Sequence, residues 1–193
     1  MPVPAMDRER TAVLVIDMQR DFLDPDAPIS TPGGRAIIPV INRLTARARA
    51  WGVPVIFTQE MHRSDRSDFG IELEFEPPHC LEGTPGMELA PELEVTPTDY
   101  RVHGKRRYDA FLGTDLETLL RGLRIENLVV VGVCTDICVS STVQHARNLD
   151  FRCFIPRECV AGTTAERHEA ALLCLGHVFG YVVLLAEVEA VLS

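Results

Sequence analysis

No apolar stretch of the 193-residue sequence approaches the roughly 18 residues that a membrane-spanning helix needs. The first residues, MPVPAMDRERTAVLVIDMQ, place charged side chains ahead of a short strand-like run, which is not the form of a cleavable signal. These two absences predict a cytoplasmic protein that does not associate with membranes.

Basic residues are scarce: 19 Lys and Arg stand against 28 Asp and Glu, a net charge of -9. This balance argues against nucleic acid as the main partner, because a polyanion would be repelled. The turn DMQRDFL, after the first apolar run, lacks the glycines of a pyrophosphate-binding fingerprint. A nucleotide-binding role therefore has little support, and we expect no organic cofactor.

Cysteines are too few and too scattered for the dense disulfide framework of a small secreted domain. We therefore expect reduced thiols. The six cysteines are Cys80, Cys134, Cys138, Cys153, Cys159 and Cys174.

The length and the 46% hydrophobic content suit one domain over residues 1–193. Short runs that are apolar at nearly every position alternate with helical segments, which is typical of strands buried on both faces of a parallel sheet. The predicted fold is α/β: three layers, doubly wound, with helices on both faces of a mostly parallel six-stranded sheet. The runs cover residues 13–16, 53–57, 100–103, 128–131, 151–155 and 182–185.

Helix boundaries have recognisable signals. Helical spacing of apolar residues predicts a helix over about residues 34–51, ended by a glycine. Capping boxes open two more helices, one at Thr114 with Glu117 and one at Thr163 with Glu166. Residues 59–99 are rich in Pro, Gly and Glu and lack clear periodicity, so we interpret them as an active-site excursion.

Three reactive side chains lie where predicted strands end, and parallel sheets bind ligands at that edge. Asp17 follows VLVI, Lys105 follows YRVHG, and Cys138 follows LVVVGVCTDI at the start of a helix. A helix start and a nearby ammonium would lower the pKa of the Cys138 thiol and make it a nucleophile. Asp17 could accept the thiol proton and return it to a leaving amine.

Each residue also has a plain structural explanation. A cysteine that opens a buried helix is often an inert small hydrophobe, and an aspartate after a strand is often a turn or cap residue. Lys105, followed by Arg106 and Arg107, could form a solvated basic turn. The residues taken singly leave both readings open.

The segments TAVLVIDMQRDFL, KRRYDAFLGTDLETLL and VVVGVCTDICVSSTVQHARNLDF resemble the isochorismatase-like cysteine hydrolases. This family includes nicotinamidases, N-carbamoylsarcosine amidases and ureidoacrylate amidohydrolases, and the resemblance covers nearly the whole chain. It implies a Rossmann-like hydrolase fold with Asp17, Lys105 and Cys138 as the catalytic set. It also implies a cis peptide from Val133 to Cys134 and an oxyanion hole made by the backbone amides of Cys134 and Cys138.

Within the excursion, TQEMH and PPHCLEGTPGMEL resemble the metal-binding segments of nicotinamidases. The resemblance implies Glu60, His62, Asp68 and His79 as ligands of a divalent metal such as Zn, Mn or Fe. Glu60 stands where the family has an aspartate, and Asp68 where some members have a histidine. The alternative is that Glu60 and His62 lie on a solvated loop while His79 braces the proline turn.

Few residues of the sequence indicate which substrate the pocket binds. Phe22 matches a wall of the family pocket, whereas Glu76 occupies the position where nicotinamidases of this type have an aromatic side chain. The resemblance also implies a homo-oligomer, either a dimer or a tetramer.

The sequence therefore predicts cysteine-dependent hydrolysis of a small amide through a thioester. Nicotinamide is the first candidate substrate, because of PPHCLEGTPG. A ureido or carbamoyl compound is the alternative on the same three residues. From another class, a non-catalytic α/β module that binds a small molecule remains open, with Cys138 purely structural.

Overall fold

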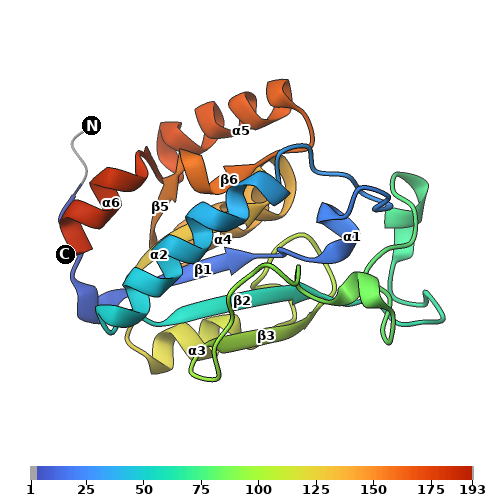
Figure 1. The fold of residues 1–193 in the computed structure, drawn as a ribbon, viewed down its shortest axis with the longest axis horizontal. Coiled ribbons are helices and arrows are strands. Elements are labelled where there is room, and N and C mark those ends of the chain that lie inside the picture. Colours follow the sequence, from blue (N-terminus) through green and yellow to red (C-terminus); the bar gives the residue numbers. More distant parts are fainter. Residues whose placement is uncertain (1–3, 193) are drawn as a thin grey trace.

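The computed structural model describes residues 4–192 and is built around a parallel sheet (Figure 1). The strands lie in the order β3-β2-β1-β4-β5-β7, and β6 pairs with β4 beside this path. All six predicted strands are present, and β6 is an addition whose two residues are too few to give a periodic signal. The strands are β1 (Thr11–Ile16), β2 (Val55–Glu60), β3 (Tyr100–Lys105), β4 (Asn127–Val133), β5 (Arg152–Pro156), β6 (Val160–Ala161) and β7 (Tyr181–Val183).

Helices cover both faces of the sheet, which confirms the doubly wound α/β fold. Side chains of a strand alternate between faces, and Val13 and Val15 of β1 pack into one core with α1, α2 and α6. Leu14 and Ile16 pack into a second core with α3, α4 and α5. The helices are α1 (Arg20–Leu23), α2 (Ile38–Ala50), α3 (Leu116–Gly122), α4 (Ser140–Asn148), α5 (Ala165–Val178) and α6 (Leu185–Leu192).

The strand order reverses between β1 and β4. The chain runs outward from β1 to β2 and β3 on one side, and from β4 to β5 and β7 on the other. Ligands of open α/β sheets bind at the carboxyl ends of the strands at such a reversal. Asp17 follows β1, Lys105 ends β3, and the turn that contains Cys138 follows β4, so the fold delivers all three to this edge.

Two predicted helix starts are wrong by one residue. The N-cap residue of α3 is Asp115 rather than Thr114, and its side chain makes no capping hydrogen bond. The cap of α5 is Thr164, whose side chain accepts a hydrogen bond from the amide of Arg167 at 3.1 Å. Thr163 instead donates its hydroxyl to Asp136, at 2.5 Å. A contact with a distant residue therefore takes the threonine that the local pattern assigned to the cap.

The excursion after β2 folds back over the carboxyl edge of the sheet. It contains short 3-10 helices at Gly70–Glu74 and Pro85–Met87. Isolated bridges pair Gln19 with Leu89 and His62 with Leu81. All six cysteines are free, as expected. In the range 4–192, none of the helices has the length and apolarity needed to cross a membrane.

Gly132 provides a test of how closely β1 and β4 approach. Its φ is +112°, and a Cβ there would lie 2.2 Å from the carbonyl oxygen of Ile16. We expect Gly132→Ala to lower the free energy of unfolding by about 3 kcal/mol or more, from strain and backbone collision together. Chemical denaturation measures this.

Gly122→Ala is the matched control. Gly122 lies in α3, and a Cβ there would meet nothing within 4 Å. Its effect should stay within about 1 kcal/mol, because alanine suits a helix better than glycine. Equal effects of the two substitutions would contradict the described approach of the strands.

Candidate active site

Lys105 is the only lysine in the chain, and it is fully buried. Its Nζ lies 2.6 Å from Oδ2 of Asp17 and donates to Sγ of Cys138 at 3.6 Å. The structure therefore brings together the three side chains that the strand ends predicted. A fourth group, which the sequence did not place here, is Glu60, whose Oε2 also lies 2.6 Å from Nζ.

Asp17 is held from the neighbouring strand. Its backbone is in the left-handed region, with φ 46°, which aspartate tolerates better than most residues. Thr58 of β2 donates its hydroxyl to Oδ1 of Asp17 at 2.6 Å, and the Asp17 amide donates back to the same hydroxyl at 3.2 Å. One carboxylate oxygen therefore faces Thr58 while the other faces Lys105.

Cys138 lies in a π-helical turn, Thr135–Val139, between β4 and α4. The peptide bond from Val133 to Cys134 before this turn is cis, as the resemblance implied. The Cys134 carbonyl accepts from the amides of both Ile137 and Val139, at 3.0 and 3.1 Å. This bonding closes the turn and fixes the backbone that carries the thiol.

The same turn is anchored by residues around the start of α5. Thr135 hydrogen-bonds Nδ1 of His168 at 2.9 Å. Asp136 accepts from the amide of Thr163 at 2.9 Å. No local signal marked His168, because its role depends on the packing of α5 against the turn.

Burial and neighbouring charges shift the pKa values of Lys105, Glu60 and Asp17 by different balances of effects. Burial alone would lower the pKa of Lys105, but Asp17 and Glu60 hold it well above its ordinary value. Burial would raise the pKa of Glu60, yet Lys105 and hydrogen bonds with two imidazoles keep it well below the usual range. Burial raises the pKa of Asp17, although Lys105 opposes the shift. Glu60 is therefore the permanent anion, and Asp17 is the carboxylate that can take up a proton.

The expected lowering of the Cys138 pKa is wrong. Burial raises the pKa of this thiol well above its ordinary value, and the charge of Lys105 only partly offsets the effect. Two carboxylates already face the single ammonium, so a thiolate would add an uncompensated buried charge. At neutral pH the resting sulfur keeps its proton.

A narrow pocket opens onto the sulfur. Apolar walls come from Phe22, Ile29 and Ile137, and Glu76 and Tyr108 add polar groups. Glu60, His79, Cys134 and Cys138 complete the lining. Phe22 thus takes the pocket-wall position that the resemblance implied, and its ring centroid lies 5.6 Å from that of His79.

Next to this pocket, two imidazoles and two carboxylates converge. Glu60, His62, Glu72 and His79 are buried, and each offers an atom within 4.8 Å of the others. Nε2 of His62 and of His79 lie 3.1 and 2.9 Å from Oε1 of Glu60. Both oxygens of Glu72 are buried without a hydrogen-bond partner among residues 4–192. Acceptor groups that converge in this way fit a divalent cation.

Asp68 does not belong to this set, which corrects the predicted ligands. It lies on the other side of His62, with Oδ1 3.4 Å from Nδ1 of that ring. His79 is held in the same way, because its Nδ1 lies 2.8 Å from the Pro77 carbonyl. Such partners orient imidazoles so that Nε2 faces the site. Glu72 takes the fourth place, which the sequence missed because 3-10 geometry rather than a motif turns it inward.

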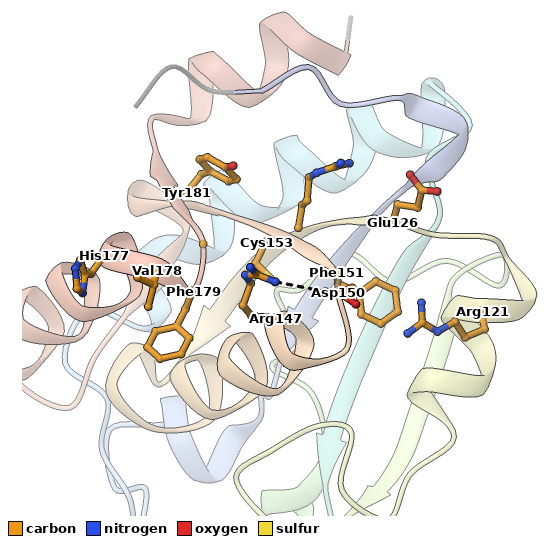
Figure 2. Close-up of a pocket in the computed structure, with 12 residues that line it drawn as sticks. Arg121, Glu126, Arg147, Asp150, Phe151, Cys153, His177, Val178, Phe179 and Tyr181 are labelled. Atoms are coloured by element: carbon orange, nitrogen blue, oxygen red, sulfur yellow. Dashed lines mark ion pairs between the residues drawn. The ribbon is translucent and has the colours of Figure 1, made fainter.

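A larger depression at the opposite edge of the sheet has a different character. Figure 2 shows its side chains around the amino ends of β5 and β7. Arg121 lies 4.4 Å above the ring of Phe151, and Arg147 pairs with Asp150 at 3.6 Å. These cations already have partners, and the depression lies at the amino ends of parallel strands, away from the usual ligand edge.

The chain is similar to known amidases in sequence and in structure. N-carbamoylsarcosine amidase from an Arthrobacter species is 36% identical over 78% of this chain and 59% of its own. The crystal structure of a pyrazinamidase/nicotinamidase from Streptococcus mutans superposes with a TM-score of 0.82 at 32% identity, covering 90% of this chain and 99% of that one.

A pyrazinamidase of Pyrococcus horikoshii, solved in complex with zinc, gives a TM-score of 0.83 at 29% identity and covers 91% of this chain and 99% of that one. Residues 11–187 match the isochorismatase domain. Because this match contains every described strand of the sheet as well as Asp17, Lys105 and Cys138, this chain belongs to the isochorismatase family.

Proposed function

We propose that this protein hydrolyses the carbon–nitrogen bond of a small linear amide through a thioester on Cys138. The observation that supports this most directly is the convergence of the Cys138 sulfur and the Asp17 carboxylate on the Lys105 ammonium, with Cys138 itself lining the pocket. Relatives named amidase and nicotinamidase act on bonds of this class.

In the first half of the reaction, the sulfur attacks the amide carbon while its proton passes to Asp17. The attack and the proton transfer have to be coupled, because the resting thiol is neutral. Asp17 returns the proton to the nitrogen, the carbon–nitrogen bond breaks, and ammonia leaves. The backbone amides of Cys134 and Cys138 are proposed to stabilise the tetrahedral oxyanion.

In the second half, water attacks the thioester with Asp17 as base, which releases the carboxylic acid and restores the thiol. Lys105 stays charged throughout and orients both the sulfur and the Asp17 carboxylate. Nicotinamide remains the first substrate to test. A ureido or carbamoyl compound is the second candidate, favoured by Glu76, which supplies a carboxylate where an aromatic wall would suit a pyridine ring.

Glu60, His62, Glu72 and His79 would hold a Zn, Mn or Fe ion, and the unpartnered oxygens of Glu72 support this fit. When bound, the metal would supply a Lewis acid that orients a substrate group or a water beside the pocket. The nucleophilic role stays with Cys138.

Replacing the nucleophile tests the proposal. We expect Cys138→Ala to abolish ammonia release from any amide that the wild type hydrolyses, while thermal unfolding stays cooperative. Cys174→Ala is the control, because Cys174 is exposed and lies outside the pocket. Turnover retained by Cys138→Ala would favour a purely structural Cys138.

Thr58→Val should shift the acid limb of the pH–rate profile. The Thr58 hydrogen bond lowers the pKa of Asp17, so its loss raises that pKa further. Asp17 must be ionised to act as base, so activity should fall at a pH about one unit higher than in the wild type. Thr45→Val, in α2 and away from the pocket, should leave the limb in place. An unmoved limb in Thr58→Val would exclude Asp17 as the titrating base.

Glu72→Gln should weaken divalent metal binding at least about tenfold, because it removes a charged ligand from a buried set. Zinc titration against a competing chelator measures this without any assay of activity. Glu74→Gln changes an exposed carboxylate in the same 3-10 helix and should have no effect. Equal affinities in the two variants would remove Glu72 from the ligand set.

A further inference from the structure

Glu76 is fixed by its neighbours in the wall of the Cys138 pocket. Its amide donates to the carbonyl of Glu72 at 2.9 Å, and the two prolines that follow restrict the backbone. Phe75 beside it faces solvent and is 80% exposed, whereas Glu76 is half-buried and lines the pocket. The turn after the 3-10 helix Gly70–Glu74 therefore presents this carboxylate to whatever the pocket holds.

Glu76 is the one carboxylate of the lining that no ion pair engages, among the residues that the structure describes. Phe22, Ile29 and Ile137 are apolar, and Glu60 is already engaged with Lys105 and the imidazoles. Burial raises the pKa of Glu76, and the Tyr108 hydroxyl opposes part of this shift. A carboxylate only accepts hydrogen bonds, so its remaining capacity matches an N–H donor.

The side chains of the pocket offer little positive charge to an anionic substrate, because His79, the one imidazole in the lining, is already engaged with Glu60 at 2.9 Å. Neither arginine nor lysine is among the lining residues in the part of the chain that the structure describes. Lys105, the nearest buried cation, already bridges Asp17 and Glu60. In protein freed of metal by a chelator, a substrate carboxylate placed here would face Glu76 without a partner, and an unpaired charge in a partly desolvated pocket is unfavourable.

We propose that Glu76 is a specificity-determining residue that selects amides whose acyl group carries an N–H donor or a cationic amine, and disfavours those that carry a carboxylate. This inference rests on the proposed hydrolysis and narrows its substrate class toward the ureido candidate and away from nicotinamide, whose neutral ring has no N–H donor. Neutral or cationic amino and ureido amides fit the pocket, whereas carbamoyl amino acids with a free carboxylate do not.

Three amides of equal chain length test the proposal: β-alaninamide, butyramide and succinamate, which end in an ammonium, a methyl and a carboxylate. We expect the wild type to have a kcat/KM for β-alaninamide at least about tenfold above that for succinamate. The ammonium of β-alaninamide gains a charge-assisted hydrogen bond to Glu76, whereas the carboxylate of succinamate is repelled by it. In Glu76→Gln this ratio should fall about tenfold. Glu74→Gln, on the solvent side of the same turn, should keep the wild-type ratio.

A wild type that prefers succinamate, or a ratio that is the same in Glu76→Gln and wild type, would overturn the specificity role and leave the hydrolytic proposal intact. If none of the three amides is hydrolysed, calorimetric binding to Cys138→Ala and to Cys138→Ala with Glu76→Gln decides the matter separately. Tighter binding of β-alaninamide than of succinamate, lost with Glu76→Gln, would support the selection by Glu76 even though the hydrolysis had failed. Equal binding of the two would refute it.

Discussion

The rest of the site depends on the ion pairs that the buried Lys105 ammonium forms with Asp17 and Glu60. Asp17 and Glu60 are both buried, and without a cation between them two carboxylates so close together would not both be ionised. Four adjacent strands supply the cluster: Asp17 follows β1, Glu60 ends β2, Lys105 ends β3 and Cys138 follows β4. The parallel sheet therefore functions as a frame that holds one cation against two anions and a thiol.

This arrangement divides the chemistry between the two carboxylates. Glu60 is stabilised as an anion by Lys105 and by two imidazoles, whereas Asp17 shares only Lys105 and a threonine hydroxyl. The proton-accepting role consequently suits Asp17, and Glu60 joins the Lys105 cluster to the candidate metal site through His62 and His79. Glu60 and Lys105 thereby connect the candidate metal site to the Cys138 sulfur.

The fold and the three central residues could be predicted because their signals are local. Fully apolar strands show up as runs in the sequence, and a polar residue directly after such a strand lies at the ligand edge of the sheet. The contacts that the sequence missed are set by packing between distant segments. Glu72 reaches the cluster through a 3-10 turn, His168 contacts Thr135 from α5, and Thr163 leaves the cap to bind Asp136.

The direction of the thiol pKa shift also needed the structure. The sequence showed a helix start and a lysine, both of which favour a thiolate. It did not show that Glu60 would form an ion pair with the same lysine and so weaken its effect on the thiol. Complete burial of the cluster then decides the sign. The charged groups around the sulfur come from strands that are distant in sequence, so their number follows from the fold and not from neighbours along the chain.

Because Lys105 is the only lysine, its charge can be observed directly by NMR of protein labelled at lysine Cε and Nζ. The account predicts a single side-chain signal that remains that of an ammonium up to about pH 10.5, the ordinary lysine range. A transition to the neutral amine below about pH 9, as for a buried lysine without paired carboxylates, would contradict it.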